Sequence, residues 1–471
     1  MSQLARPRSV TAVAALADIA LGVIALGAVA CSESTSPKQR DVPTAVHVVA
    51  AHTLLGDGDT ATLSAVVTGQ RGDTLATAPV AWSTTDAAAV TVDAASGRVT
   101  AVTKGSAWVV ASIGTARDSV QVMVGYRKIS GPEPFVSVSL FLQTFQPGDG
   151  CALTAQGTAY CWGSNRKGQL GDGGTQSSTT PVPVAGGLLF ADLQAGNQGA
   201  CGLTKGDGAL YCWGSNAHAQ FGTSSRVPLS SNVPLLGPPT LRFSAFSLSP
   251  DGTTCGVSKA DAALYCWGND TYWTTGKDTS VDLLVDAVVA PVTGGLRATQ
   301  VDVGELHGCA VGSDGAVWCW GKDGTTYGAA TNSRVPVKIV PPGTIASVTS
   351  GEYATCGLAS DGQALCWGSP LVAPGADPSA VVPAPTAVGG ALRFRKLSSS
   401  FRDFECGLTT GGDIYCWGSN GSSGTGVDAL LGRAGPSAPA SAPVPVLPGR
   451  KFVDVDQWCA VDVAGSIYCW H

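Results

Sequence analysis

Fourteen of the fifteen cysteines form seven close pairs that recur along the chain at a nearly constant distance. The two cysteines of a pair lie ten or eleven residues apart, and tryptophan always follows the second. From pair to pair, the second cysteine advances by 51, 54, 53, 47, 50 and 53 residues. A period near fifty favours one repeat array, a propeller or a solenoid, over several unrelated domains. The pairs are Cys151 and Cys161, Cys201 and Cys212, Cys255 and Cys266, Cys309 and Cys319, Cys356 and Cys366, Cys406 and Cys416, and Cys459 and Cys469.

Each pair frames a predicted β-hairpin. Two apolar runs flank a turn such as Asp314-Gly315 or Asp361-Gly362, whose residues tolerate the positive φ of a tight hairpin. Cysteines at the two ends face each other across the strands, at a Cβ separation of about 4.5–5.5 Å. An even set of cysteines in an exported chain therefore indicates disulfides. Zinc is the alternative, but each pair is isolated and histidine is scarce.

Each repeat contains enough strand-like segments for a four-stranded sheet. An alternating run precedes the hairpin, as at 190–193 and 452–455, and a glycine-rich loop with a Pro-Val strand follows it, as at 181–184 and 443–446. With 61 Gly, 28 Pro and 13% charged residues, the composition suits short strands and tight turns. We expect an all-β protein in which residues 126–471 form a seven-bladed β-propeller.

Short sequence motifs around the hairpins carry a family resemblance. Trp162-Gly163-Ser164-Asn165 followed by Gly168-Gln169-Leu170-Gly171, and Gly304-Glu305-Leu306-His307 before a hairpin, resemble the RCC1 repeat. The repeats after Cys319 and Cys366 lack the Gln-Leu-Gly motif, which weakens any inherited binding site. The tryptophan of each repeat is expected to pack between blades. A carbohydrate-binding ring of these tryptophans is the alternative.

The last repeat ends after its third strand, so its sheet needs an outer strand from elsewhere. Residues 134–140 alternate as a strand does and precede the first full repeat. They are predicted to complete the last blade and so close the ring.

The first 42 residues predict export. Arg6 and Arg8 precede an apolar run at 9–30, which indicates a signal peptide over 1–30. Ala28-Val29-Ala30-Cys31 resembles a bacterial lipobox, which implies lipidation of Cys31 and a tether over 31–42. Simple signal cleavage and an uncleaved membrane anchor are the alternatives. The predicted location is the bacterial cell envelope, by lipid anchorage, or the exterior.

Residues 43–125 differ from the repeats, because they contain no cysteine and many Val, Thr and Ala. Alternating runs such as 61–67 predict an Ig-like β-sandwich. The segments 80–86, 90–93, 97–102 and 104–107 resemble the bacterial Ig-like group 2 (BIG2) module. The resemblance implies a spacer, with an adhesive unit as the alternative.

The sequence contains no recognisable catalytic motif, and its five histidines are scattered over different modules. We therefore expect a protein that is not an enzyme and needs no cofactor or metal. Glu305 and Glu352, in equivalent loops of adjacent repeats, are the candidates for a glycosidase-like pair. The net charge of −6, without a basic block, disfavours nucleic-acid binding.

The loops between the first and second strands are expected to surround one mouth of a central channel and to bind a protein or polysaccharide. Two aromatic residues of another loop, Tyr272 and Trp273, are further candidates for an anchor. Alternatives are a guanine-nucleotide exchange factor, by family resemblance, and a carbohydrate-active hydrolase or lyase. The candidate binding residues are Asn197, Gln198, Asp251, Tyr272, Trp273, Glu305, His307, Glu352, Tyr353, Arg402, Asp403, Gln457 and Trp458.

Overall fold

A computed structural model describes residues 41–50, 54–56, 58–103, 105–141, 149–196, 198–278, 284–322, 332–372, 381–400, 404–419 and 440–470. The predicted signal peptide, most of the tether and Cys31 lie outside the described residues. Within these ranges, no helix is both long and apolar enough to cross a membrane. The described chain is built of β-strands, with one short 3₁₀ turn at Pro370–Val372, so the expected all-β class is confirmed.

From Phe135 to Val446, the strands form antiparallel sheets of four, each made of strands consecutive in sequence. The first sheet contains β10 (Phe135–Leu140), β11 (Gly150–Thr154), β12 (Ala159–Gly163) and β13 (Ser178–Pro183). The second contains β14 (Phe190–Ala195), β15 (Gly199–Thr204), β16 (Leu210–Ser215) and β17 (Ser230–Leu236). The third contains β18 (Phe243–Leu248), β19 (Thr253–Ser258), β20 (Leu264–Asn269) and β21 (Val285–Pro291).

Three more sheets repeat this order. The fourth contains β22 (Ala298–Val303), β23 (His307–Gly312), β24 (Val317–Gly321) and β25 (Ser333–Ile339). The fifth contains β26 (Ile345–Ser350), β27 (Ala354–Ala359), β28 (Ala364–Gly368) and β29 (Val382–Val388). The sixth contains β30 (Phe394–Ser399), β31 (Phe404–Thr409), β32 (Ile414–Gly418) and β33 (Ala440–Val446). The last repeat supplies β34 (Phe452–Asp456), β35 (Cys459–Asp462) and β36 (Ile467–Trp470).

In each repeat, the two cysteines lie directly opposite each other on the second and third strands. Cys151 pairs with Cys161 in the register of β11 and β12, and the other six pairs occupy the same place. All seven pairs are joined as disulfides, with Cα–Cα distances of 4.0–4.1 Å. Each disulfide is therefore a local cross-link within one hairpin, buried in the core of its own repeat.

The prediction that residues 134–140 close the last sheet is wrong. They form β10, whose Leu140 pairs with Gly150, so they are the first strand of the first sheet. The strand that completes the last sheet is the end of β9 (Ala116–Ile129), where Tyr126 pairs with Trp470 and Ile129 with Ile467. Alternation marks a strand but does not say which partner it takes. The sequence did not reveal that the end of β9 pairs with β36, because this segment continues a strand of the preceding module.

The module before the repeats has three groups of paired strands around one apolar core. Its strands are β1 (Pro43–Val49), β2 (Leu54–Gly56), β3 (Thr60–Thr62), β4 (Ser64–Gly69), β5 (Ala81–Thr84), β6 (Val90–Val92), β7 (Arg98–Ala101), β8 (Gly105–Ile113) and β9. β1 pairs with β4, β6 and β3 flank β7, and β8 pairs with β5 and β9. Because β9 crosses the predicted boundary at 125/126, one strand belongs to both modules. The Ig-like and BIG2 assignments remain predictions.

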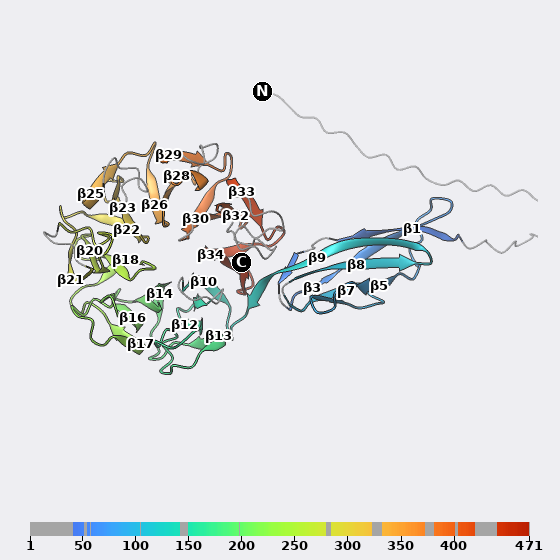
Figure 1. Cartoon of the computed structure of the whole chain (residues 1–471), viewed down its shortest axis with the longest axis horizontal. Helices are drawn as coiled ribbons and strands as arrows, with labels where there is room; N and C mark the ends of the chain where they lie inside the picture. Colours follow the sequence, from blue (N-terminus) through green and yellow to red (C-terminus); the bar gives the residue numbers. More distant parts are fainter. Residues whose placement is uncertain are drawn as a thin grey trace, which may run out of the picture. The chain divides into compact units, whose positions relative to one another are not determined.

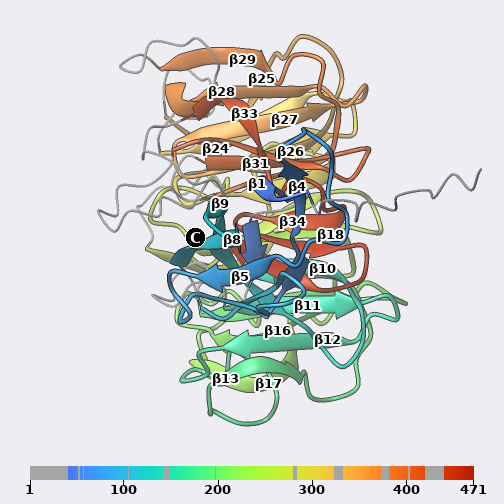
Figure 2. The same ribbon diagram turned by 90° about the vertical axis from the view of Figure 1, so that its right-hand side faces the viewer.

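The repeats are arranged around a central axis (Figure 1). Their first strands, β10, β14, β18, β22, β26, β30 and β34, lie innermost, and each contacts the next. β34 also contacts β10, which joins the last repeat to the first. In the view turned by 90°, strands such as β12, β16 and β29 run along the direction in which Figure 1 is seen (Figure 2). The axis is therefore lined by first strands from every repeat.

Candidate functional site

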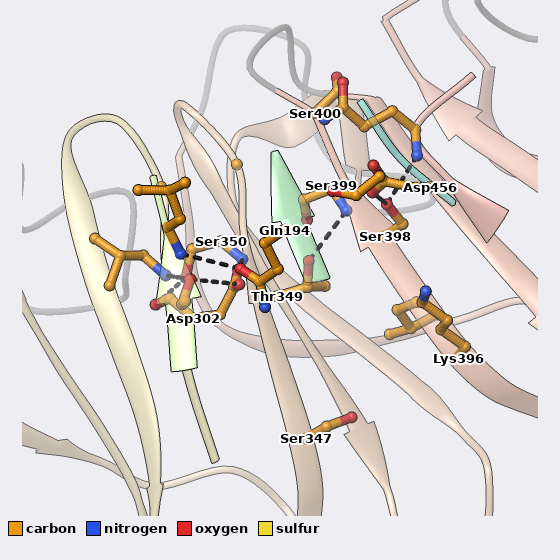
Figure 3. A pocket seen from close by; sticks show the side chains of 18 of the residues that line it. Gln194, Asp302, Ser347, Thr349, Ser350, Lys396, Ser398, Ser399, Ser400 and Asp456 are labelled. Atoms are coloured by element: carbon orange, nitrogen blue, oxygen red, sulfur yellow. Dashed lines mark hydrogen bonds between the residues drawn. The ribbon is translucent and has the colours of Figure 1, made fainter. Parts of the chain in front are cut away.

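The innermost strands enclose a polar cavity of ≈ 340 Å³ (Figure 3). Residues of all these first strands line it, and most are serine, threonine, glutamine or aspartate. The cavity also reaches the loops that follow the first strands, at Pro250, Glu305, Gly351 and Gln457. One mouth of the channel is therefore formed by the loops that the sequence singled out.

A ring of hydrogen bonds runs around this cavity, one from each first strand to the next. The fifth residue of a first strand accepts a hydrogen bond from the backbone N–H of the sixth residue of the following one, or, in the last repeat, from Gln457 directly after β34, and the last strand returns to the first. The acceptors and donors are Ser139 and Ala195, Gln194 and Leu248, Ser247 and Val303, Asp302 and Ser350, Thr349 and Ser399, Ser398 and Gln457, and Asp456 and Leu140. Their lengths lie between 2.6 and 3.0 Å.

The ring explains why a polar residue recurs at the fifth position of every first strand. The inner edge of a first strand has no neighbouring strand, so its N–H groups need side-chain partners. Two third-position side chains add to the ring: Gln300 accepts from Val348 N, and Asp454 accepts from Val138 N. Figure 3 shows Asp302 beside Ser350 and Asp456 beside Ser398. The sequence analysis did not predict this structural role, although a polar residue recurs at the fifth position of every first strand.

Removing one acceptor should destabilise the ring measurably. Ser247 is 1% exposed, accepts from Val303 N at 3.0 Å and donates to Asp302 Oδ1 at 3.2 Å. In Ser247→Ala two buried polar groups lose a partner, so the free energy of unfolding should fall by about 1–3 kcal/mol. Urea unfolding of the oxidised protein measures this. Ser244→Ala, an exposed change in the same strand, should have an effect below about 0.5 kcal/mol; equal effects would contradict the assigned role.

The cavity carries more acidic than basic side chains. Its lining contains Asp192, Asp302, Glu305, Asp454 and Asp456 against Arg395 and Lys396. Lys396 Nζ lies 2.6 Å from Asp454 Oδ1, and Arg395 donates to the carbonyls of Phe452 and Val453. Burial raises the pKa of Asp302 to about 6, although hydrogen bonds from Ser350 and Ser247 favour its carboxylate.

Three carboxyl groups gather at the mouth, from loops of successive repeats. Asp251 lies between β18 and β19, Glu305 between β22 and β23, and Glu352 between β26 and β27. Partial burial raises the pKa of Glu305 to about 7, and the charges of Asp251 and Glu352 add to the rise. We call these three residues the acidic mouth.

The other predicted loop residues fall into three groups. Asn197, Arg402 and Asp403 lie outside the described residues. Tyr353 is 44% exposed beside Glu352, and Gln198 is half-buried with φ of +53°. Gln457 is 5% exposed, and the ring of Trp458 stacks on Phe404 at 6.5 Å between centroids. The described loops thus combine exposed side chains with others packed into the mouth.

The expectation that His307 belongs to a recognition loop is wrong. His307 begins β23 and is fully buried, with its Nε2 2.8 Å from Thr355 Oγ1 of the next repeat. Packing between neighbouring sheets leaves none of its surface for a partner.

Trp273 is held within the chain instead of projecting from it. Arg334 lies over its ring at 4.2 Å from the centroid, and Lys322 at 5.3 Å. Lys322 also donates to the carbonyl of Thr271 in the same loop. These cation–π contacts occupy the ring, and Tyr272 beside it is half-buried. The candidate aromatic anchor is therefore part of the packing between the third and fourth repeats.

The repeated tryptophans pack between sheets, as expected. Trp162, Trp213, Trp267, Trp320, Trp367, Trp417 and Trp470 are all 0% exposed. Trp213 Nε1 donates to the carbonyl of Gln169 in the preceding repeat at 2.9 Å. A Cβ added at Gly171, which has φ of +64°, would lie 2.7 Å from the Trp213 ring. The loop motif that includes Gln169 and Gly171 thus forms a seat for the next tryptophan. Burial excludes the carbohydrate-binding alternative.

The same segments match a known family. Residues 156–203 match the model of the Regulator of chromosome condensation (RCC1) repeat. A second model of that repeat matches residues 190–220, 298–328 and 345–370. Over these residues the chain carries RCC1 repeats. The matched segments include the seat around Gln169, and the resemblance drawn from these motifs is confirmed for the repeats.

Curated relatives share the RCC1 repeats over part of their length. The human E3 ubiquitin-protein ligase HERC2 is 28% identical over 199 residues, which cover 40% of this chain and 4% of that protein. The Ultraviolet-B receptor UVR8 of Arabidopsis thaliana is 28% identical over 174 residues, covering 36% of this chain and 38% of the receptor. This chain thus spans well under half of either relative.

Two solved structures share the fold. Human WBSCR16 is 17% identical with a TM-score of 0.58, and the match covers 76% of this chain and 91% of that one. Prp20p from Saccharomyces cerevisiae is 17% identical with a TM-score of 0.55, covering 69% and 80%. At this identity the likeness concerns the fold alone, an RCC1-like propeller.

Proposed function

We propose that this protein is a non-catalytic binding scaffold, a closed seven-bladed propeller that recognises a protein through the acidic mouth and the loops beside it. The hydrogen-bond ring that returns from Asp456 to Leu140 supports the blade count and gives these loops a rigid base. The observation that carries the proposal is Glu305, a partly exposed carboxyl at the end of a polar cavity. Prp20p, which shares the fold, is described by its binding to Gsp1p and histones, and both are proteins.

We further propose that it works outside the cytoplasm, attached through a lipid on Cys31, with the Ig-like module as spacer. The cross-strand cysteine pairs support this location, because disulfides persist in oxidising compartments. The intact mass of the native protein tests it: a chain beginning at Cys31 with acyl groups and fourteen oxidised thiols is expected. Free thiols would contradict the location.

Catalysis and nucleotide exchange have less support. A mouse RCC1-like G exchanging factor-like protein is 26% identical over 184 residues, covering 38% of its length. Such a role requires a cytosolic or nuclear GTPase, which the proposed location excludes. For a hydrolase, Glu305 and Glu352 are neighbouring carboxyl groups at the mouth, but partial burial, with smaller contributions from the charges of Asp251 and Glu352, accounts for the raised pKa of Glu305 without a reaction. Binding therefore stays the proposal that the site supports best.

Capture of the partner tests the scaffold. The full chain, immobilised in native form, should retain a protein from envelope extract. The double variant Glu352→Ala and Tyr353→Ala should lose most of it, at least tenfold, because side chains at the centre of an interface dominate binding. Glu133 is exposed and precedes β10, whereas the mouth loops follow the first strands, so Glu133→Ala should retain the partner.

The outcomes separate the alternatives. If the double variant Glu352→Ala and Tyr353→Ala retained the protein and Glu133→Ala lost it, the assignment of binding to the acidic mouth would be contradicted. Retention of a polysaccharide fraction alone would replace the protein partner. Thermal melting of each variant shows whether a loss comes from unfolding.

A further inference from the structure

The third repeat contains a buried lysine in direct contact with a carboxylate. Lys277, in the loop after β20, has its Nζ 2.7 Å from Asp286 Oδ2 of β21. Their side chains are 10% and 6% exposed, whereas both side chains of the pair formed by Lys338 and Asp314 are more than half exposed. Lys277 also donates to the carbonyl of Val288 at 2.6 Å. An amine and a carboxyl group are thus held against each other with little access for water.

A second carboxyl group, that of Asp270, lies beside this pair. Asp270 follows β20 and donates its backbone N–H to the carbonyl of Leu284. Gly268, two residues before Asp270, pairs with Asp286. Side chains two residues apart along a strand point to the same face, so Asp270 and Asp286 are diagonal neighbours across the two strands. The charges of Asp286 and Lys277 accordingly both act on the pKa of Asp270.

The first repeat shows that the positions of Asp270 and Lys277 approach each other. Asn165 and Asp172 occupy the equivalent positions, because they too are seven residues apart after a Cys-Trp-Gly segment. Asn165 Nδ2 donates to Asp172 Oδ1 at 3.2 Å. In both repeats, Oδ1 of the earlier residue accepts the backbone N–H five residues further on. The loop of the third repeat therefore brings Lys277 to the side of Asp270.

One oxygen of Asp270 has no hydrogen-bond partner among the described residues. Its Oδ1 accepts from the N–H and the hydroxyl of Thr275, but its Oδ2 accepts from neither, and the residue is 1% exposed. Burial raises the pKa of Asp270, and the charge of Asp286 adds to the rise, against the hydrogen bonds from Thr275. This oxygen is a buried base within the cluster that can take up a proton and release it again.

Burial also favours the neutral amine of Lys277. It lowers the pKa of Lys277 more than the charge of Asp286 raises it. Lys396 is a contrast, because its Nζ also lies close to a carboxylate, 2.6 Å from Asp454 Oδ1. Burial lowers the pKa of Lys396, but the charges of Asp454 and Asp456 outweigh this effect and raise it. A nucleophilic lone pair is therefore favoured at Lys277 and disfavoured at Lys396.

We infer that Lys277 and Asp286 become joined by an isopeptide bond once the chain has folded. The lone pair of Nζ attacks Cγ of Asp286 and forms the C–N bond, while one C–O bond of that carboxyl breaks and its electron pair leaves with the oxygen. One proton of the ammonium passes directly to the carboxylate, and Asp270 carries a second proton from the nitrogen to the departing oxygen, which leaves as water. An ammonium and a carboxylate contain all the atoms of an amide and one water, so no oxidant, reductant or other reactant is needed. The contact between the two groups supplies the proximity, and the remaining N–H still donates to Val288.

The bond adds a second covalent cross-link to the third sheet. The disulfide between Cys255 and Cys266 joins β19 to β20, and the amide fixes the loop after β20 to the start of β21. Reducing agents break the disulfide and leave the amide intact, so the two cross-links can be measured separately.

Peptide mapping of the purified native protein by mass spectrometry tests the inference. After denaturation and reduction, trypsin should yield residues 260–297 as one piece that weighs one water molecule less than its sequence. Without the bond, cleavage after Lys277 gives separate peptides 260–277 and 278–297 of full mass. Fragmentation of the joined peptide should place the lost water between Lys277 and Asp286. Cleavage after the exposed Lys338 should be normal.

Three variants test the assigned roles. Lys277→Arg keeps the positive charge but has no primary amine, so both separate peptides should appear at full mass. Asp270→Asn keeps both reacting groups and restores the residue type of Asn165, and the cross-linked fraction should fall by about tenfold or more, because positioned proton transfer contributes about 10²–10⁴ in rate. Asp314→Asn, which alters the exposed pair, should leave the cross-link unchanged. Thermal melting shows whether each variant is folded.

Two results would overturn the inference. One is a native wild-type protein that yields only the two separate peptides at full mass. The other is loss of a water molecule that persists in Lys277→Arg, which would show that a different group, such as an aspartate closing on its own backbone, has lost the water. Full cross-linking in a folded Asp270→Asn protein would contradict the role given to Asp270.

Discussion

Replacing Trp213 with alanine is expected to lower the free energy of unfolding by about 3–5 kcal/mol, the usual cost of deleting a buried tryptophan. The side chain is 0% exposed and packs between the first and second repeats with Leu170 and Phe190. Its Nε1 donates to the carbonyl of Gln169, so the substitution also leaves that carbonyl without its partner. Denaturant unfolding with the disulfides intact provides the measurement.

Two control substitutions distinguish the loss of the buried Trp213 side-chain volume from the loss of its hydrogen bond to Gln169. Trp213→Phe keeps most of the ring and loses the donor, so its cost should be smaller than that of Trp213→Ala. Trp108 in β8 is 49% exposed, and Trp108→Ala should cost less than about 1 kcal/mol. A similar cost for Trp108→Ala and Trp213→Ala would show that the seat in the preceding repeat contributes little.

Disrupting the pairing of β9 with β36, which completes the last sheet, is expected to have the second large effect on stability. Arg127 and Lys128 pair with Cys469 and Tyr468, so this short segment of β9 holds the outer edge of the last sheet. Proline at both positions removes whichever N–H faces β36 and restricts φ, at a cost of about 3 kcal/mol or more. The backbone amides of β36 should then exchange hydrogen much faster, as mass spectrometry would detect. Self-association through the exposed edge is also expected.

The matched control replaces Arg127 and Lys128 with alanine. It removes the hydrogen bond from Arg127 to the carbonyl of Thr179 and the contact of Lys128 with Asp59, but it keeps the backbone donors. Exchange in β36 should stay close to that of the wild type. Rapid exchange in the alanine variant would assign ring closure to these side chains and not to strand pairing.

Most of each repeat could be predicted because its information is local. Cysteines ten or eleven residues apart, a turn glycine and a following tryptophan are all within one hairpin, so spacing along the chain predicts their pairing. The RCC1 repeats, the all-β class and the packing of the tryptophans were read correctly from such patterns. The closing strand was missed, because an edge strand pairs with whichever sheet is left open and its sequence does not name the partner.

The candidate site was also predicted only in part from the sequence. The loops of Asp251, Glu305 and Glu352 were found because equivalent positions in successive repeats lie at the same mouth of a ring. His307 was misplaced, and the half-buried Trp273 packs within the chain, since exposure depends on what neighbouring repeats place over a side chain: Thr355 in one case, Arg334 and Lys322 in the other. Those neighbours lie 48 to 61 residues away in sequence.

The amino-acid sequence by itself determined the repeat, its hairpin, its cysteine pairs and the tryptophan between sheets, because each depends on contacts within one repeat or on a motif present in many. Only the tertiary structure decided that β9 closes the last sheet, that polar fifth residues form a hydrogen-bond ring, and that three carboxyl groups share one mouth. These features arise from residues brought together by the circular arrangement. Side chains far apart in sequence acquire partners and shifted pKa values only when the first strands meet around a common axis.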